Sequence, residues 1–171
     1  EYSSFLGAGA YRHFIPSVVK QITSRSEFMT SYTPYQPEVS QGTLQAHFEF
    51  QSMVCELTDM EVANAGMYDG ATSAAEAVLM ACRINKKFKV EIVGAVSPLY
   101  TDVIKTLTQA TGIEISYNNI ETILNNDDDA PACYVIQQPN FLGEISDIDQ
   151  LKILSNKNNA LLIVISEPMF L

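Results

Sequence analysis

The stretch "DGATSAAEA", residues 69–77, combines residue types that suit an anion-binding site. A glycine lets the backbone approach a ligand closely, and the two hydroxyl side chains can donate hydrogen bonds. The free amides at the start of a helix add partial positive charge, which favours a phosphate group. The candidate phosphate cup consists of Asp69, Gly70, Ala71, Thr72 and Ser73. A capped helix start made of small packing residues explains the same letters, and both interpretations stay open.

Two further stretches follow apolar, strand-like runs. In "QQPNFLGEISD", Asn140 comes after a proline and can point its amide at a ligand. In "SEPMFL", Glu167 can meet a cationic ring nitrogen. Both stretches are expected at the carboxyl ends of parallel strands, where α/β sheets bind their ligands. An asparagine after proline is also an ordinary turn residue, and a carboxylate before proline at the end of a strand is common, so these alternatives stand as well.

The loop "YTPYQPEVSQG", residues 32–42, places tyrosines and a glutamine between prolines that restrict the backbone. Phenol, hydroxyl and amide groups held in this way can orient a carboxylate or bind a cofactor without covalent chemistry. The candidate residues are Tyr32, Thr33, Tyr35 and Gln36, with Arg12 and His13 as weaker candidates near a helix start. A stiff entry into the following helix explains the loop equally well.

Hydrophobic periodicity predicts the elements that position these residues. A helix of about five turns is expected after Pro37, then a short strand or extended run at "MEVANAG" and a helix over "DGATSAAEAVLMACRIN". The strands "FKVEIVGA", "IEISYN", "ACYVIQQ" and "ALLIVIS" then alternate with the helices "SPLYTDVIKTLTQATG", "IETILN" and "DIDQLKILSNK". Ser97 is the expected N-cap of the first of these helices, Pro98 its first residue and Gly112 its stop. The alternation predicts an α/β fold, a mostly parallel sheet in a three-layer αβα sandwich.

Length and charge limit the class of protein. The chain of 171 residues is long enough for a single domain, with residues 1–40 as a loop or arm and residues 41–171 as the αβα core. It starts at Glu1 and stops just after an apolar run, which predicts a fragment truncated at both ends. A net charge of −10 disfavours nucleic acid. No apolar run approaches the roughly 20 residues that span a bilayer, which favours a soluble protein. Three scattered cysteines fit a reducing, cytoplasmic compartment.

Several kinds of site are missing from the sequence. The three cysteines are far apart, so neither a disulfide framework nor a metal site is predicted, and residues 127–129 are interpreted as a solvated acidic turn. The chain has no dinucleotide fingerprint, no P-loop and no nucleophile elbow. None of its seven lysines lies in an apolar, glycine-flanked setting that suits a Schiff base, and all seven are expected to be solvated.

The motifs together carry a family resemblance. "FLGAGAYRHFIP", the run from "SYTPYQPE" to "YDGATSAAEA", and "QQPNFLGEISD" closely resemble glycine decarboxylase, the P protein of the glycine cleavage system. The forms "YDGATSAAEA" and "QQPNFLG" look most like subunit 1, the alpha subunit, of the bacterial two-subunit enzyme. The resemblance covers most of the chain.

This resemblance implies part of the large domain of a fold-type I pyridoxal-phosphate (PLP) transferase. The family reaction is glycine dehydrogenase (decarboxylating) chemistry: glycine loses CO₂ and its aminomethyl group passes to the lipoyl arm of the H protein. It further implies an α2β2 heterotetramer in which subunit 2 supplies the Schiff-base lysine and holds PLP. The candidate cup, Asn140 and Glu167 would then form a degenerate cofactor pocket, while the loop residues would reach the partner's site. Two alternatives remain: another fold-type I PLP enzyme whose lysine lies beyond Leu171, and a noncatalytic scaffold subunit.

Overall fold

The computed structural model describes residues 8–125 and 129–171, which form two compact units. One unit comprises Tyr11–Gly66, and the other comprises Met67–Leu171 together with residues 8–10. The division falls after Gly66 rather than after residue 40, so the long helix that follows Ser40 groups with the N-terminal segment. Whether the whole chain counts as a single domain stays a prediction.

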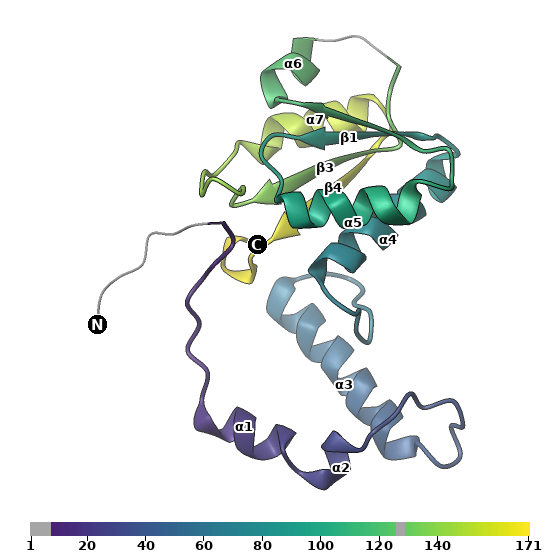
Figure 1. The fold of residues 1–171 in the computed structure, drawn as a ribbon, viewed down its shortest axis with the longest axis vertical. Helices are drawn as coiled ribbons and strands as arrows, with labels where there is room; N and C mark the ends of the chain where they lie inside the picture. The colour runs from purple at the N-terminus through teal and green to yellow at the C-terminus, as the bar shows by residue number, and fades with distance from the viewer. Residues whose placement is uncertain (1–7, 126–128) are drawn as a thin grey trace. The chain divides into compact units, whose positions relative to one another are not determined.

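The Met67–Leu171 unit is built on a four-stranded sheet in which every pairing is parallel (Figure 1). The strands lie in the order β2-β1-β3-β4. Their bounds are β1 Lys89–Val93, β2 Glu114–Asn118, β3 Cys133–Gln138 and β4 Leu161–Ser166. Every residue of β3 is buried, which explains why its sequence is not a simple apolar–polar alternation. The four predicted strands and the parallel sheet are confirmed.

Helices cover both faces of this sheet and complete three layers (Figure 1). Helices α4 and α5 pack on one face, and α6 and α7 pack on the other. Their bounds are α4 Gly70–Asn85, α5 Pro98–Thr108, α6 Ile120–Asn125 and α7 Ile148–Lys157, followed by a short 3-10 helix, η1 Pro168–Phe170. The predicted α/β class and its four helices are confirmed. Of the predicted acidic turn, only Asp129 lies within the described residues, and it is exposed.

The predicted start of α5 is confirmed, but its predicted end needs correction. Ser97 occupies the N-cap position, but its side chain makes no capping bond, and its backbone N–H donates to Oε1 of Gln137 at 2.7 Å. Pro98 is the first helical residue, as predicted. The helix ends at Thr108 rather than running to Gly112, which adopts a positive φ of 75° in the turn beyond.

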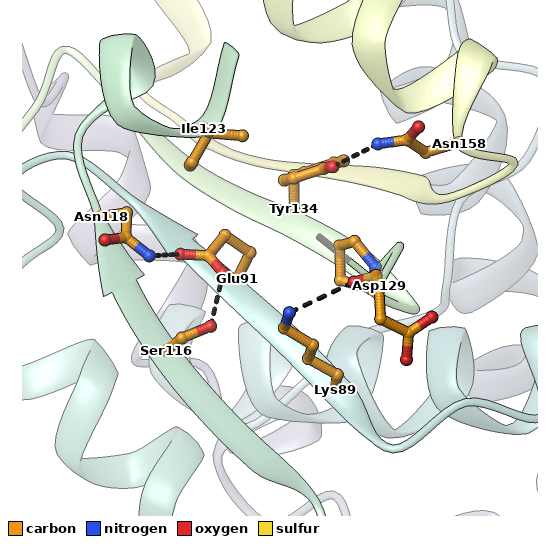
Figure 2. A pocket seen from close by; sticks show the side chains of 9 residues that line it. Lys89, Glu91, Ser116, Asn118, Ile123, Asp129, Tyr134 and Asn158 are labelled. Carbon is orange, nitrogen blue, oxygen red and sulfur yellow. Dashed lines mark hydrogen bonds between the residues drawn. The ribbon is translucent and has the colours of Figure 1, made fainter. Parts of the chain in front are cut away.

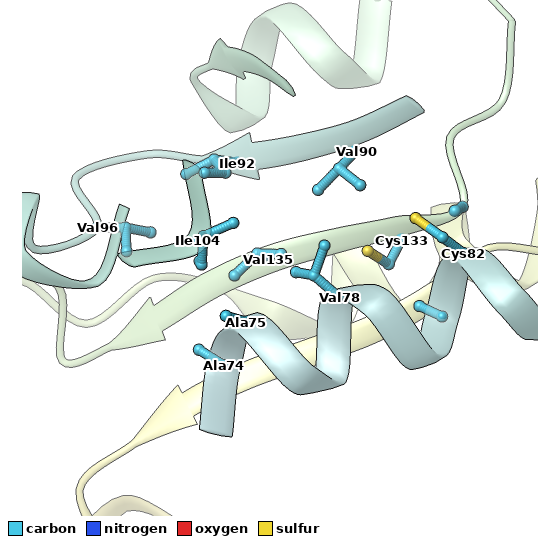
Figure 3. Close-up of a cluster of buried hydrophobic side chains, with 12 residues drawn as sticks. Ala74, Ala75, Val78, Cys82, Val90, Ile92, Val96, Ile104, Cys133 and Val135 are labelled. Carbon is cyan, nitrogen blue, oxygen red and sulfur yellow. The ribbon is translucent and has the colours of Figure 1, made fainter. Parts of the chain in front are cut away.

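The α4/α5 face holds the larger apolar core (Figure 3). Alanines at the start of α4 allow the helix to lie close to the strands, since they add almost no side-chain bulk. The fully buried side chains here include Val78, Val90, Ile104, Cys133 and Val135. Burial raises the pKa of the Cys133 thiol to about 12, with the nearby Cys82 thiol adding to the shift. Cys133 therefore stays protonated and packs as a small apolar side chain.

The Tyr11–Gly66 unit contains three helices: α1 Ser17–Thr23, α2 Ser26–Met29 and α3 Gln41–Thr58. The predicted five-turn helix is α3, whereas α1 and α2 are too short for the pattern to have indicated them. No residue of these three helices is buried. Residues 60–66, predicted as a short strand or an extended run, form no strand in the described structure, because a strand needs a ladder partner. The carbonyl of Ala63 instead accepts a hydrogen bond from the Gln51 side chain at 2.6 Å. Among the described residues, no helix combines the length and apolarity needed to cross a membrane.

Candidate functional site

The N-terminus of α4 lies at the carboxyl edge of the sheet, defined by the strand ends at Val93, Asn118, Gln138 and Ser166. At the other end of α4, the Asn85 side chain donates to the carbonyl oxygens of Ala132 at 2.7 Å and Asn159 at 3.3 Å. Ala132 is the residue before β3 and Asn159 lies two residues before β4, so the C-terminus of α4 lies at the opposite edge. The predicted cup is therefore placed at the edge where α/β sheets bind ligands.

At this helix start, Asp69 is an N-cap. Its Oδ1 accepts a hydrogen bond from the Thr72 backbone N–H at 2.7 Å, and the Ser73 hydroxyl donates to the Asp69 carbonyl at 2.7 Å. The bond from the Thr72 backbone amide is the main reason that the pKa of the Asp69 carboxyl lies below its ordinary value. The backbone amides of Thr72 and Ser73 thus both find acceptors on Asp69, which matches the capped-helix interpretation.

Gly70, which follows the N-cap, is required by the packing of α4 against α5. A Cβ added to Gly70 would meet the hydroxyl and ring of Tyr100 on α5. Ala71 and Thr72 are half-buried, and Ala74 and Ala75 are buried. The small residues of the motif therefore bring α4 and α5 together.

Asn140 organises the loop after β3 instead of pointing a free amide outward. Its Oδ1 accepts from the backbone amides of Leu142 at 2.9 Å and Glu144 at 3.0 Å. Its Nδ2 donates to the Glu144 carboxylate at 2.9 Å, and only 7% of the residue is exposed. The turn interpretation of this asparagine therefore accounts for all of its side-chain bonds.

Two glutamines that the sequence analysis did not single out connect the loops at this edge. Gln137 accepts from the Ser97 backbone and so ties β3 to the start of α5. Gln138 both donates to the carbonyl of Ser146 and accepts from its amide, each at 3.1 Å, beside the cis peptide bond to Pro139. Two adjacent amide side chains at the end of a buried strand were the available signal, because buried polar groups need partners.

Glu167 lies next to this loop, directly after β4. Its backbone N–H donates to the carbonyl of Gln138 at 3.1 Å, which continues the pairing of β3 with β4. The residue is half-buried and serves as the N-cap of η1. The structure therefore brings Asn140 and Glu167 to neighbouring strand ends, as expected from the sequence.

The residues at this edge do not fit a phosphorylated cofactor on this chain. The carboxylate of Asp69 occupies the helix start and accepts its amide, so a phosphate there would meet a negative charge. All seven lysines lie within the described residues, and none of them is buried. Lys87 and Lys89 are half-buried rather than fully solvated, and both sit near the start of β1, away from the carboxyl edge. Whether the site is a degenerate cofactor pocket stays a prediction.

The opening-loop residues belong to the other unit, Tyr11–Gly66. The rings of Tyr32 and Tyr35 lie 6.0 Å apart between centroids and are 80% and 76% exposed. The Tyr35 N–H donates to the carbonyl of Thr33 at 2.8 Å, which fixes a tight turn around Pro34. Gln36 is exposed as well.

Arg12 and His13 lie in irregular backbone ahead of α1, not at a helix start. Both are exposed, and both take part in interactions within the structure. Their assignment to a partner's site stays a prediction.

A polar cavity under the α6/α7 face was not expected from the sequence (Figure 2). Glu91, in the middle of β1, is 6% exposed and points into this cavity. The Ser116 hydroxyl donates to one carboxylate oxygen, and Nδ2 of Asn118 donates to the other at 2.7 Å. The signal was a lone glutamate inside the apolar run "KVEIV", where a buried charge is costly unless it has partners. Among the described residues, no group of three or more metal-ligating side chains is present.

Comparison with known proteins identifies the family of this chain. The model of the glycine cleavage system P-protein matches residues 1–171. The probable glycine dehydrogenase (decarboxylating) subunit 1 of Chlorobium luteolum is 48% identical over 100% of this chain and 40% of its own length. The protein of the same name from Chlorobium limicola is 50% identical over 99% of this chain and 40% of its own length.

A solved structure agrees with these sequence matches. The crystal structure of glycine decarboxylase (P-protein) of the glycine cleavage system, in inhibitor-bound form, superposes with a TM-score of 0.84. It is 40% identical, and the match covers 97% of this chain and 39% of that one. The chain thus spans about 40% of the length of the curated relatives it matches. It belongs to the P-protein family of the glycine cleavage system.

Proposed function

We propose that the protein carrying this chain is subunit 1 of a two-subunit glycine decarboxylase. It would support the decarboxylation of glycine and the transfer of the aminomethyl group to the lipoyl arm of the H protein. The observation that carries this proposal is the 48% identity to a protein named subunit 1 that extends over 100% of the chain. Loop and strand-end motifs lie within that match, so the likeness is not confined to the apolar core.

We infer that PLP is held by the partner, subunit 2, and not by this chain. Two features support this assignment. The start of α4 presents the Asp69 carboxylate where a phosphate would need positive charge, and none of the seven lysines is buried. Burial is one of the ways in which a protein lowers a lysine pKa enough for Schiff-base chemistry. The cup, Asn140 and Glu167 then serve packing and loop order at the carboxyl edge.

The opening loop is the part of this chain that we assign to the shared site. Tyr32 and Tyr35 expose their phenol rings, and the prolines around them limit the entropy lost when the loop meets a partner. Thr33 and Gln36 add a hydroxyl and an amide on the same segment. These groups would orient the substrate carboxylate or the cofactor, with Arg12 and His13 as further contributors.

The word "subunit" in the names of the relatives supports a complex of more than one chain. We propose an α2β2 heterotetramer with subunit 2, acting in the cytoplasm of a bacterium in glycine catabolism. If the chain were only a scaffold for subunit 2, changes in the opening loop would leave turnover intact as long as assembly is intact.

Reconstitution tests both ideas. The protein carrying this chain is combined with subunit 2 and lipoyl H protein, and exchange of ¹⁴CO₂ into glycine is measured beside sedimentation of the complex. We expect Tyr35→Phe and Gln36→Ala to lower turnover at least tenfold with assembly unchanged. Glu38→Gln, an exposed change in the same loop, is the control and should keep full turnover. Turnover unaltered in both loop variants would support the scaffold, and no exchange from the complete mixture would overturn the proposed activity.

A further inference from the structure

The cavity under the α6/α7 face has the size and composition of a small ligand site (Figure 2). Its volume is about 170 Å³, equivalent to roughly five or six water molecules at about 30 Å³ each. Its lining includes Lys89 and Glu91 of β1, Ser116 and Asn118 of β2, Tyr134 of β3 and Asn158 at the end of α7. These polar groups come from three neighbouring strands and from the end of α7, and none of them is one of the cup residues, Asn140 or Glu167.

Glu91 provides a negative wall whose charge is not neutralised by a side chain. Its two partners, Ser116 and Asn118, are neutral donors. Among the ion pairs found between described residues, none involves Glu91. A carboxylate that is 6% exposed and bonded only by neutral groups gains strongly from a cation brought into contact with it.

Lys89 provides a positive charge on the same face of β1 as this carboxylate. Residues two apart on a strand point to the same face, with a separation of roughly 6.6 Å along the strand. Lys89 nevertheless directs its Nζ to the backbone carbonyl of Asp129 at 3.2 Å, not to Glu91. Among the described residues, Asp129 also lines the cavity, but in Figure 2 its carboxylate points away from Glu91.

Tyr134, which is paired with Glu91 where β3 lies beside β1, adds a hydrogen-bond donor to the cavity. Its phenol oxygen accepts from Nδ2 of Asn158 at 2.8 Å, which fixes the position of the hydroxyl. Burial is the main cause that raises the pKa of Tyr134, and the nearby Glu91 charge adds to it. The phenol therefore keeps its proton, which it can donate to an anionic group.

From this geometry we propose that the cavity binds a small zwitterionic α-amino acid with a compact side chain. Its ammonium group contacts the Glu91 carboxylate, and its carboxylate contacts the Lys89 ammonium and the Tyr134 hydroxyl. A simple cation would be repelled by Lys89 and a simple anion by Glu91, whereas a zwitterion carries a charge opposite to each of them. The volume limits the side chain to a few heavy atoms. This site is separate from glycine decarboxylation and does not depend on that proposal.

The test is equilibrium dialysis of the full chain, without PLP, against radiolabelled L-alanine, with saturation-transfer NMR to show contact of the alanine methyl group. We expect saturable binding at one site per chain, with ethylammonium and acetate binding at least tenfold more weakly because each pairs with only one of these two charges. Glu91→Gln and Lys89→Met should each weaken L-alanine binding at least tenfold. Lys87→Met is the matched control, because Lys87 donates to the carbonyl of Pro131 at 3.4 Å but does not line the cavity.

The variants are first compared by circular dichroism and urea unfolding, and Tyr134→Phe provides a milder change if Glu91→Gln unfolds. In Tyr134→Phe we expect a several-fold loss of L-alanine binding while the fold persists. Three results would overturn the assignment: no saturable binding at concentrations up to about 20 mM, well above the millimolar range of weak ligands; binding that survives in Glu91→Gln; or equal loss in Lys87→Met.

Discussion

The two faces of the sheet are formed by the same strands but differ in the environment that they create. On the α4/α5 face, β1 presents Val90 and Ile92 to an apolar layer that contains small helix residues. On the α6/α7 face, the intervening residue Glu91 meets polar neighbours and a cavity of about 170 Å³. Because side chains alternate along a strand, one buried strand supplies both a close-packed core and a polar site.

This difference indicates where the chain can change without losing its fold. A close-packed layer loses stability whenever volume is removed, since its neighbours relax only partly. A polar cavity tolerates change in volume but loses stability when a buried donor is left without an acceptor. The following predictions test that contrast.

The largest effect is expected from Ile104→Ala on α5. Ile104 is fully buried in the α4/α5 core, so the truncation should lower the free energy of unfolding by about 2–5 kcal/mol. Urea unfolding followed by circular dichroism measures it. Ile153→Ala, at a site on α7 that is 71% exposed, is the control and should change stability by no more than about 0.5 kcal/mol. A loss below about 1 kcal/mol in Ile104→Ala would contradict close packing on this face.

On the polar face, Glu91→Leu should lower the free energy of unfolding by less, about 1–3 kcal/mol. The change leaves the Asn118 amide without its acceptor and leaves the Ser116 hydroxyl with only the Val90 carbonyl at 3.3 Å, although water in the cavity can replace part of the lost bonding. Glu114→Leu, at an exposed position on β2, serves as the control in the same urea experiment. A variant more stable than the parent would show that desolvation of Glu91 outweighs its hydrogen bonds.

The sequence predicted the framework of the sheet better than the chemistry of its faces. Strands such as "ACYVIQQ" and the alternation with helices were sufficient for a parallel three-layer fold, because burial on both faces leaves a continuous apolar pattern. The resemblance in "YDGATSAAEA" and "QQPNFLGEISD" gave the family, which the comparisons confirm.

What the sequence left open depended on contacts between distant residues. Whether Asn140 faces a ligand or its own loop is decided by the Glu144 side chain and by backbone amides whose positions no local pattern gives. The Glu91 cavity arises from β1 and β2 lying side by side. The run "MEVANAG" has the composition of a strand but no partner among the described residues, and so it stays irregular.

Gly70→Ala tests the contact between α4 and α5 at the carboxyl edge. The added methyl group would meet the Tyr100 hydroxyl, and we expect a net loss of about 1 kcal/mol despite the better helix propensity of alanine. Gly42→Ala in α3 meets nothing within 4 Å and should instead stabilise by about 0.5–1 kcal/mol. In the Tyr100→Phe background the loss from Gly70→Ala should shrink, and an unchanged loss would rule out this contact as its cause.

The smallest loss of stability is expected from Asp69→Ala. The pH dependence of this loss shows whether it comes from the ionised carboxylate. Asp69 has a folded-state pKa below its ordinary value of 3.8, mainly because it accepts the Thr72 backbone N–H. A lowered folded pKa means that ionised Asp69 stabilises the fold fully above 3.8 and loses that contribution as the pH falls through the folded pKa. The difference in urea midpoint between parent and Asp69→Ala should therefore be constant between about pH 5 and 7 and should shrink below 3.8. Asp149→Ala, an exposed change in the first turn of α7, controls for the loss of a carboxylate that accepts no capping bond. If the difference in urea midpoint instead grows on acidification, Asp69 does not stabilise the helix through its ionised carboxylate. The start of α4 would then again be a candidate anion-binding site.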